Sequence, residues 1–322
     1  MSRLAHGFVH ALALAVLLIS PPLGAQGRFS FAVIGDTPYF PVEEQGFATL
    51  LGELDAEPLA FVVHVGDIKR AGAPCTDALF TARRMLFDAS RHPFVFIPGD
   101  NEWTDCHASG SDPLERLVAL RRIFYPGEAS LGQRRIALAR QSSDPRHAEY
   151  HENVRWEHGR VLFVGLNVPG SNNNLGRTAA MDAEHRHRMN AVLDWLDESI
   201  ALAERRDNAA VVILLHANPG FEGAAPRFRG APDGFVELRN VLRAHVLRLA
   251  RPVLLVHGDT HAFRLDQPLR DRPSGAILAN FTRLEVPGSP AAEAVVVDVD
   301  PATRSVFSVR RPESEMIFPD NP

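Results

Sequence analysis

The sequence predicts an α/β fold built on a buried, largely parallel sheet. Uniformly apolar segments alternate with segments of helical spacing, and an acid or a histidine follows each of five apolar segments. Strands that are apolar on both faces and separated by helices are typical of parallel sheets. In such sheets, ligands bind where the carboxyl ends of the strands meet.

Five apolar segments are expected to be strands that lead into this edge. They are RFSFAVIGD, ending at Asp36; LAFVVHVGD, ending at Asp67; PFVFIPGD, ending at Asp100; AAVVILLHANP, with His216; and PVLLVHGDTH, with Asp259 and His261. Turn propensity explains one or two acids at such places. Four repeats of Gly-Asp together with a histidine indicate one shared site.

Amphipathic segments between the strands are expected to be helices. These segments are EEQGFATLLGELD, TDALFTARRMLFDAS, MDAEHRHRMNAVLDWLDESIALAERR and PDGFVELRNVLRAHVLRLA. The middle of the chain, from RRIALARQ to residue 168, indicates antiparallel strands with a turn near His158-Gly159. The tail, residues 292–311, indicates a hairpin around Asp300-Pro301.

Residues 1–25 are expected to form a secretory signal peptide that is cleaved after Ala25. Arg3 precedes an apolar run that is short for a membrane span, and the alternative is an uncleaved anchor. We therefore expect a periplasmic or secreted protein with no membrane span after cleavage. Residues 26–322 are expected to form a single domain, and the sequence leaves the oligomeric state open.

The composition narrows the choice of partners and of redox compartment. The chain has 322 residues and a formal net charge of −5, which argues against binding nucleic acid by general electrostatics. Its two cysteines, Cys75 and Cys106, are expected to pair if the chain is exported, and two free thiols are the alternative.

Four aspartates at one sheet edge require compensating cations. Burying carboxylates without a partner is costly, and Lys69 is the only lysine near these motifs. Divalent metal ions are the simplest source of positive charge, and the two histidines extend the ligand set. The sequence therefore predicts a metal site at this edge.

The series GD, GD, GDNE, H and GDTH resembles the calcineurin-like metallophosphoesterases. Both the order of the motifs and their placement after strands match, over roughly Phe29 to Phe263. The resemblance implies a four-layer α-β-β-α sandwich with a dinuclear metal centre that cleaves phosphoesters. It makes Asp67 the bridging carboxylate, joined at one metal by Asp36 and His261 and at the other by Asp100, His216 and Asp259.

Several positions depart from that family pattern. Pro38 replaces a metal-binding histidine, and Tyr39 is either a substitute ligand or a packed turn residue. Asp100 and Asp259 replace an asparagine and a histidine, so the oxygen-rich site is expected to favour Mn, Fe or Mg, with Zn less favoured. Asn101 replaces the histidine that contacts the phosphate or the leaving group. An amide cannot protonate a leaving group, which leaves His64, His257 or a bound water as the proton source.

The expected function is that of an exported metal-dependent phosphoesterase, which hydrolyses a phosphate mono- or diester by metal-activated water. Its alternative is a non-catalytic, metal-binding relative of the same fold that acts as a binding protein. The expected catalytic residues are Asn101, His216 and His261. Contacts to a small-molecule, lipid or nucleotide phosphoester are assigned to Asn101, Lys69 and Asn172.

The cysteines are expected to lie at the rim of this site. Cys75 follows Asp67 and Cys106 follows Asp100 by a few residues each. If both aspartates reach one metal centre, the loops after them start close together, and the two cysteines come within bridging distance. We therefore expect a Cys75–Cys106 disulfide.

Overall fold

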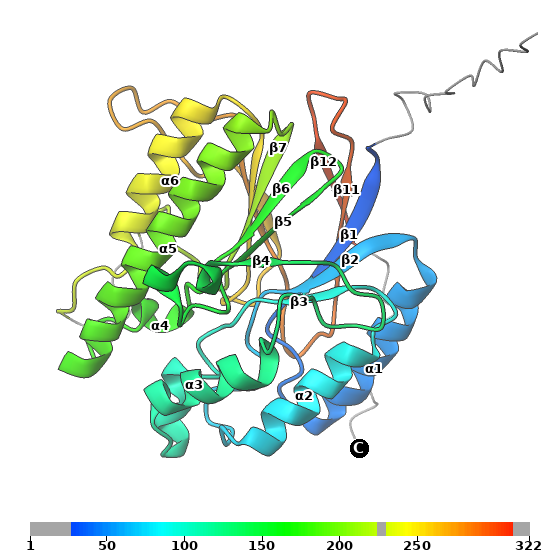
Figure 1. Ribbon diagram of the computed structural model, residues 1–322, viewed down its shortest axis with the longest axis vertical. Helices are drawn as coiled ribbons and strands as arrows, with labels where there is room; N and C mark the ends of the chain where they lie inside the picture. Colours follow the sequence, from blue (N-terminus) through cyan, green and yellow to red (C-terminus); the bar gives the residue numbers. More distant parts are fainter. Residues whose placement is uncertain (1–26, 224–229, 312–322) are drawn as a thin grey trace, which may run out of the picture.

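The computed structural model describes residues 27–223 and 230–311. Two β-sheets lie face to face, and helices cover the outer face of each sheet (Figure 1). The predicted signal peptide lies outside the described residues. Within the described residues, no helix combines the length and the apolar character needed to cross a membrane.

The first sheet has the strand order β12-β11-β1-β2-β3. Its parallel part brings three of the predicted strands together, and the C-terminal hairpin adds two antiparallel strands beside β1. The strands are β1 (Phe29–Ile34), β2 (Leu59–His64), β3 (Phe94–Phe96), β11 (Val295–Val299) and β12 (Phe307–Arg310).

The second sheet has the order β4-β5-β6-β7-β8-β10-β9. Strands β6, β7, β8 and β10 are parallel, while β5 pairs with β6 as the predicted antiparallel hairpin. The strands are β4 (Ala139–Arg140), β5 (Val154–His158), β6 (Val161–Gly165), β7 (Ala210–Leu214), β8 (Val253–His257), β9 (Arg264–Asp266) and β10 (Phe281–Glu285).

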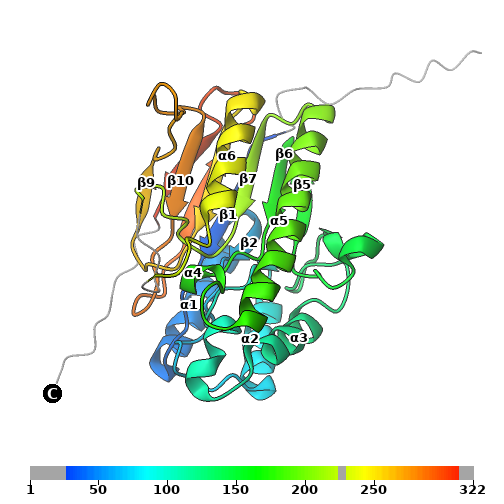
Figure 2. The same ribbon diagram turned by 90° about the vertical axis from the view of Figure 1, so that its left-hand side faces the viewer.

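Helices form the two outer layers, and their apolar faces supply the outer cores. The first sheet packs on α1 (Pro41–Ala56), α2 (Asp77–Ala89) and α3 (Pro113–Phe124). The second packs on α5 (Ala179–Arg205) and α6 (Val236–Leu249), which run along one face in Figure 2. Shorter helices are α4 (Gly170–Asn173) and the 3₁₀ segments Thr104–Ser109, Gln141–Ser143 and Pro145–His147.

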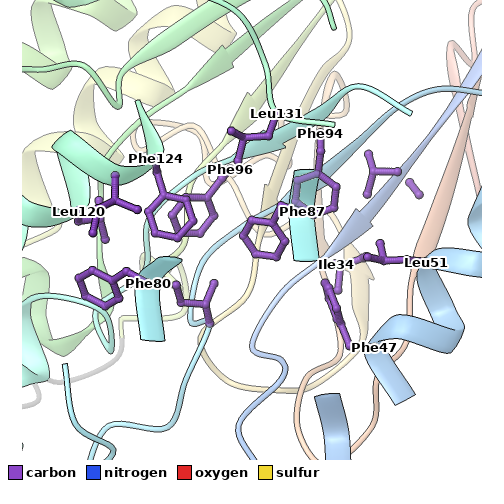
Figure 3. Packing of buried hydrophobic residues seen from close by; sticks show 14 of the residues in the cluster. Ile34, Phe47, Leu51, Phe80, Phe87, Phe94, Phe96, Leu120, Phe124 and Leu131 are labelled. Atoms are coloured by element: carbon purple, nitrogen blue, oxygen red, sulfur yellow. The ribbon is translucent and has the colours of Figure 1, made fainter. Parts of the chain in front are cut away.

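Alternating side chains of each central strand enter two different cores, because a strand directs successive residues to opposite faces. In β1, Ala32 and Ile34 face the helices, whereas Phe31 and Val33 face the other sheet. Aromatic rings dominate the layer between the first sheet and its helices (Figure 3), as in the stacked pair Phe87 and Phe94, whose centroids are 4.4 Å apart. Burial on both faces explains why these strands are uniformly apolar.

The four-layer α-β-β-α arrangement is the fold class that the sequence predicted, and it is confirmed. The predicted disulfide is also present, with 5.7 Å between the Cα atoms of Cys75 and Cys106. Helix α3 and strands β9 and β10 were not anticipated from the sequence.

Candidate metal centre

The polar residues that follow the strands of both sheets converge at one edge of the sandwich. The turns after β1, β2 and β3 supply Asp36, Asp67 and Asp100, and those after β7 and β8 supply His216, Asp259 and His261. Four of these six residues have left-handed backbones, with φ of 55° at Asp36, 62° at Asp67, 77° at Asp259 and 60° at His261. Residues other than glycine rarely adopt such backbone conformations, and those that do are often at functional sites.

The candidate ligand atoms form two groups that share one imidazole. Asp36, Asp67 and His216 each place a ligand atom within 4.8 Å of the others, and so do Asp100, His216 and Asp259. His261 joins at the side of Asp36, with 3.5 Å between its Nε2 and Asp36 Oδ1. The resemblance gave the central place to Asp67, whereas the residue common to both groups in this structure is His216.

Both histidines are oriented as metal ligands are. The Nδ1 of His216 donates to the carbonyl of Val65 at 2.8 Å, and the Nδ1 of His261 donates to the carbonyl of Ser289 at 2.9 Å. A carbonyl accepts only from N–H, so each Nε2 is left to face the carboxylates. The Nε2 of His216 lies 3.1 Å from Asp100 Oδ1 and 3.4 Å from Asp67 Oδ1. A backbone carbonyl that fixes the far nitrogen is the usual support of a ligating histidine.

The electrostatics of the site call for added positive charge. Burial raises the pKa of Asp36 to about 8 and raises the pKa of Asp67 well above its usual range. Burial alone would lower the pKa of His216, but the carboxylates of Asp67, Asp100 and Asp36 outweigh it and raise that pKa well above its usual range. Protons thus take the place of a cation here.

Glycines leave room for these side chains. A Cβ atom on Gly170 would come 2.6 Å from Asp259 Oδ1 and 3.0 Å from Asp100 Oδ1, and a Cβ on Gly258 would clash with Asp36 Oδ2. Any other residue at either position would displace a candidate ligand. The close backbone, the left-handed turns and the oxygen and imidazole donors all fit a divalent cation.

Tyr39 and Asn101 lie together beside Asp67. The Tyr39 hydroxyl donates to Asp67 Oδ2 at 2.8 Å and lies 3.2 Å from His261 Nε2. The amide of Asn101 donates to the Tyr39 oxygen at 3.1 Å and also to Asp67 Oδ2. Pro38 cannot serve as a ligand, but the hydroxyl of the next residue, Tyr39, lies between two candidate ligands, Asp67 and His261.

Two residues predicted to bind substrate do other work in this structure. Lys69 is only 1% exposed, and its ammonium donates to the carbonyls of Arg70 and Ala71, which close its own loop. Asn172 is 3% exposed and uses its amide on the backbone of Leu175, Pro232 and Gly234. In both cases the polar atoms of the side chain form hydrogen bonds with buried backbone groups, so neither position supports the predicted substrate contact.

His64 and His257 are fully buried. The Nε2 of His64 donates to the carbonyl of Thr37 at 2.8 Å, while its Nδ1 accepts from the backbone N–H of Gly66 at 3.1 Å. Burial lowers the pKa of His64 to about 3, and that of His257 likewise to about 3. Their burial and lowered pKa values argue against both histidines as proton sources.

Two further polar contacts near the candidate ligands were not anticipated from the sequence. Ser171 donates its hydroxyl toward Asp100, and Arg177 pairs with Asp105. Both residues lie in the segment 165–177. Residues 170–174 are buried. The run of three asparagines, which tolerate left-handed backbones, was the available signal.

Comparison with known proteins gives structural neighbours alone. No protein-family model matches the sequence, and no curated protein matches it either. Two distant structures are a dimetal phosphatase from Danio rerio, with TM-score 0.47 and 16% identity over 84% of this chain and 95% of that one, and Haemophilus influenzae NAD nucleotidase (NadN), with TM-score 0.44 and 13% identity over 88% and 49%.

A solved structure of PhoD is more similar. It superposes with a TM-score of 0.57 at 15% identity, over 87% of this chain and 66% of PhoD, so this chain spans just under two thirds of the length of PhoD. At this level of identity the likeness establishes the architecture: the chain has the two-sheet, four-layer fold of the metallophosphoesterase type.

Proposed function

We propose that this protein is an exported, metal-dependent phosphoesterase that acts on a small phosphate mono- or diester. The observation that supports this most directly is the pair of ligand groups around His216, which would hold two neighbouring cations. Asp36, Asp67 and His261 would surround one position, with the Tyr39 hydroxyl beside it, and Asp100, His216 and Asp259 would surround the other. An imidazole whose Nδ1 is already donating cannot bridge two ions, so we assign the bridge to the carboxylate of Asp67.

Two divalent cations at these positions would activate a water molecule and screen the negative charge of the phosphoester. The chain itself would then orient the substrate. Asn101 is 6% exposed, and both hydrogens of its amide are donated to Tyr39 and Asp67, so one of them would have to leave its partner to reach a phosphate oxygen. The carbonyls of Val65 and Ser289 keep the imidazoles of His216 and His261 in the ligating tautomer.

Tyr39 is the side chain that we assign to hold a proton near the leaving group. Its hydroxyl lies beside the Asn101 amide and Asp67. Without bound ions, burial and the neighbouring carboxylates raise the pKa of Tyr39, so its hydroxyl keeps its proton. Esters with good leaving groups, which need little protonation, should therefore be cleaved best.

Export is supported by the apolar N-terminal segment and by the Cys75–Cys106 disulfide, since disulfides persist mainly in oxidising compartments. A cytosolic location of the full-length protein in fractionated cells would contradict this part of the proposal.

The test combines metal analysis with a panel of chromogenic esters. Purified chain is stripped with a chelator, reconstituted with Mn²⁺, Fe²⁺, Mg²⁺ or Zn²⁺, and assayed on p-nitrophenyl phosphate and bis-p-nitrophenyl phosphate. We expect up to two ions per chain and hydrolysis with Mn²⁺, Fe²⁺ or Mg²⁺. Metal uptake without hydrolysis of either ester would favour the non-catalytic binding protein, and a response to Zn²⁺ alone would refute the expected metal preference.

A further inference from the structure

The segment that begins with α4 is a turn of the opposite hand to an ordinary helix. Four consecutive residues have left-handed backbones, with φ of 49° at Ser171, 56° at Asn172, 55° at Asn173 and 66° at Asn174. Left-handed conformations are unfavourable for side chains other than glycine and occur mostly as single residues. A run of four persists only where the surrounding structure fixes it.

Helix α5 and the neighbouring loop provide that restraint. Arg188 is fully buried, and its guanidinium donates to Asn173 Oδ1 at 2.7 Å and to the carbonyls of Asn167 and Asn173 at 3.0 Å. Asn172 is held by the backbone of Pro232 and Gly234. The turn is therefore clamped between two elements that take no part in the candidate ligand set.

Ser171, the first left-handed residue of the clamped turn, contacts the candidate metal centre. The Ser171 Oγ lies 2.6 Å from Asp100 Oδ2 and 2.7 Å from Asp105 Oδ1. Asp105 also accepts from Arg177 and from Thr104 Oγ1. A hydroxyl has one hydrogen to donate, and Asp105 already has these other donors, so we assign the Ser171 hydrogen to Asp100.

We propose that Ser171 is a positioning residue for the Asp100 side of the metal centre, an inference that rests on the function proposed above. Its hydroxyl holds Oδ2 of Asp100, which leaves Oδ1 directed at the group of His216 and Asp259, 3.1 Å from His216 Nε2. The strained backbone of the turn is kept because it delivers this hydroxyl. Arg188 acts through the turn by fixing it.

Two substitutions separate the hydroxyl from the strain. Ser171→Gly removes the hydroxyl and relieves the left-handed backbone, whereas Ser171→Ala removes the hydroxyl and keeps the strain. Ala250→Gly is a matched control, because Ala250 is an exposed left-handed residue (φ 47°) at the end of α6 that has no polar side chain to lose. All three are made in the full chain, stripped with a chelator and titrated with Mn²⁺ by calorimetry, alongside thermal unfolding of the metal-free protein.

The positioning role predicts that affinity and stability move independently. In both Ser171 variants, Mn²⁺ affinity should fall about tenfold, in the range found for groups that orient metal ligands. Metal-free Ser171→Gly should unfold at or above the wild-type temperature and Ser171→Ala no higher than wild type, while Ala250→Gly should bind Mn²⁺ as wild type does. A merely structural serine would instead give a Ser171→Gly variant with unchanged affinity.

The outcomes distinguish this inference from the proposed function. Wild-type binding of Mn²⁺ together with unchanged binding by Ser171→Gly overturns the role of Ser171 and leaves the metal centre in place. Failure of the wild type to bind Mn²⁺ overturns the metal centre itself, and Ser171 then has no ligand to position. A tenfold loss in both Ser171 variants with an unaffected control supports the proposal.

Discussion

At the scale of single residues, the proposed centre depends most on Asp67. Its Oδ1 accepts from the backbone N–H of Asn101 at 2.9 Å and its Oδ2 from Tyr39, so both oxygens are held in place before any ion binds. We expect Asp67→Asn to lose one equivalent of metal and more than about 100-fold in activity. This is a larger loss than the substitution of a residue that only orients a ligand causes. Elemental analysis and ester hydrolysis measure both effects. Asp194→Asn, a surface substitution, should change neither, and full metal content in the Asp67 variant would refute the bridging assignment.

Tyr39→Phe tests the second residue-scale assignment. The variant keeps the ring, which packs edge-on against His261 with centroids 5.2 Å apart, and removes only the hydroxyl. We expect an unchanged thermal midpoint, a Mn²⁺ affinity lowered about tenfold, and a greater loss of activity on esters with poor leaving groups than on p-nitrophenyl esters. Equal losses on both kinds of ester would argue against a proton held by Tyr39.

The predicted residues that lie together at the sheet edge and those whose side chains bond to nearby backbone differ in a physical way. Asp36, Asp67 and Asp100 follow apolar strands, so the chain order alone carries them to one edge. Lys69 and Asn172 were assigned to substrate because they are polar and close to a motif. In a tight turn, a polar side chain can bond to the buried backbone around it instead of contacting a substrate. The spacing of residues in the sequence does not distinguish these two possibilities.

At the scale of elements, strand β10 of the second sheet could not be predicted from its hydrophobic pattern. Strand β10 reads FTRLE, and its two charged residues disrupt the apolar pattern expected of a central strand. Both are buried: Arg283 pairs with Asp266 on β9 and with Glu222, and Glu285 accepts from Thr260. Partners on other elements make this burial acceptable, and no local window of sequence contains them. The stretch of β2 from Leu59 to Val63 is apolar and needs no such partners, and this strand was predicted correctly.

The disulfide joins the two loops that follow β2 and β3. Cys75 and Cys106 are both buried, and each sulfur lies 3.7 Å from the carbonyl of Asn101, the residue after Asp100. The two half-cystines are 31 residues apart, so the paired change Cys75→Ser/Cys106→Ser should cost about 3–4 kcal/mol of unfolding free energy by loop closure.

It should also weaken Mn²⁺ binding several-fold, because the Asn101 loop loses its anchor. Urea denaturation of the metal-free protein and Mn²⁺ calorimetry measure the two effects separately. An affinity equal to that of the wild type would limit the disulfide to a role in stability. Two free thiols in denatured, unreduced wild-type protein would contradict the bond itself.

At the scale of the whole molecule, the centre joins the two sheets. Asp36, Asp67 and Asp100 come from the first sheet, whereas His216 and Asp259 come from the second, so a bound ion would tie the halves of the sandwich together. Anything that binds only the folded state stabilises it, by about 2.7 kcal/mol at a hundred times the dissociation constant. We therefore expect chelation to lower the unfolding temperature by several degrees.

The pH dependence of that loss follows from the buried groups. Without an ion, the folded-state pKa values of Asp36 (about 8), Asp67 and His216 lie above their unfolded values. Groups of this kind contribute stability at low pH that is lost as pH rises through the folded pKa. His64 and His257, with pKa values lowered to about 3, act in the opposite sense, but their contribution is complete above about pH 6.5. Between pH 6.5 and 8.5, the metal-free protein should therefore become less stable as pH rises.

The metal-loaded protein should show the opposite trend in the same window, because ions displace protons from the ligands and bind more tightly as pH rises. The gap in unfolding free energy between loaded and stripped protein should thus widen from pH 6.5 to 8.5. Urea denaturation at both pH values, with Mn²⁺ in excess or with chelator, measures this gap. The Ala250→Gly variant, which changes no titrating group, should show the same widening. A gap that stays constant or narrows would mean that the buried carboxylates and His216 do not exchange protons for metal, and the assignment of these residues as ligands would fail with it.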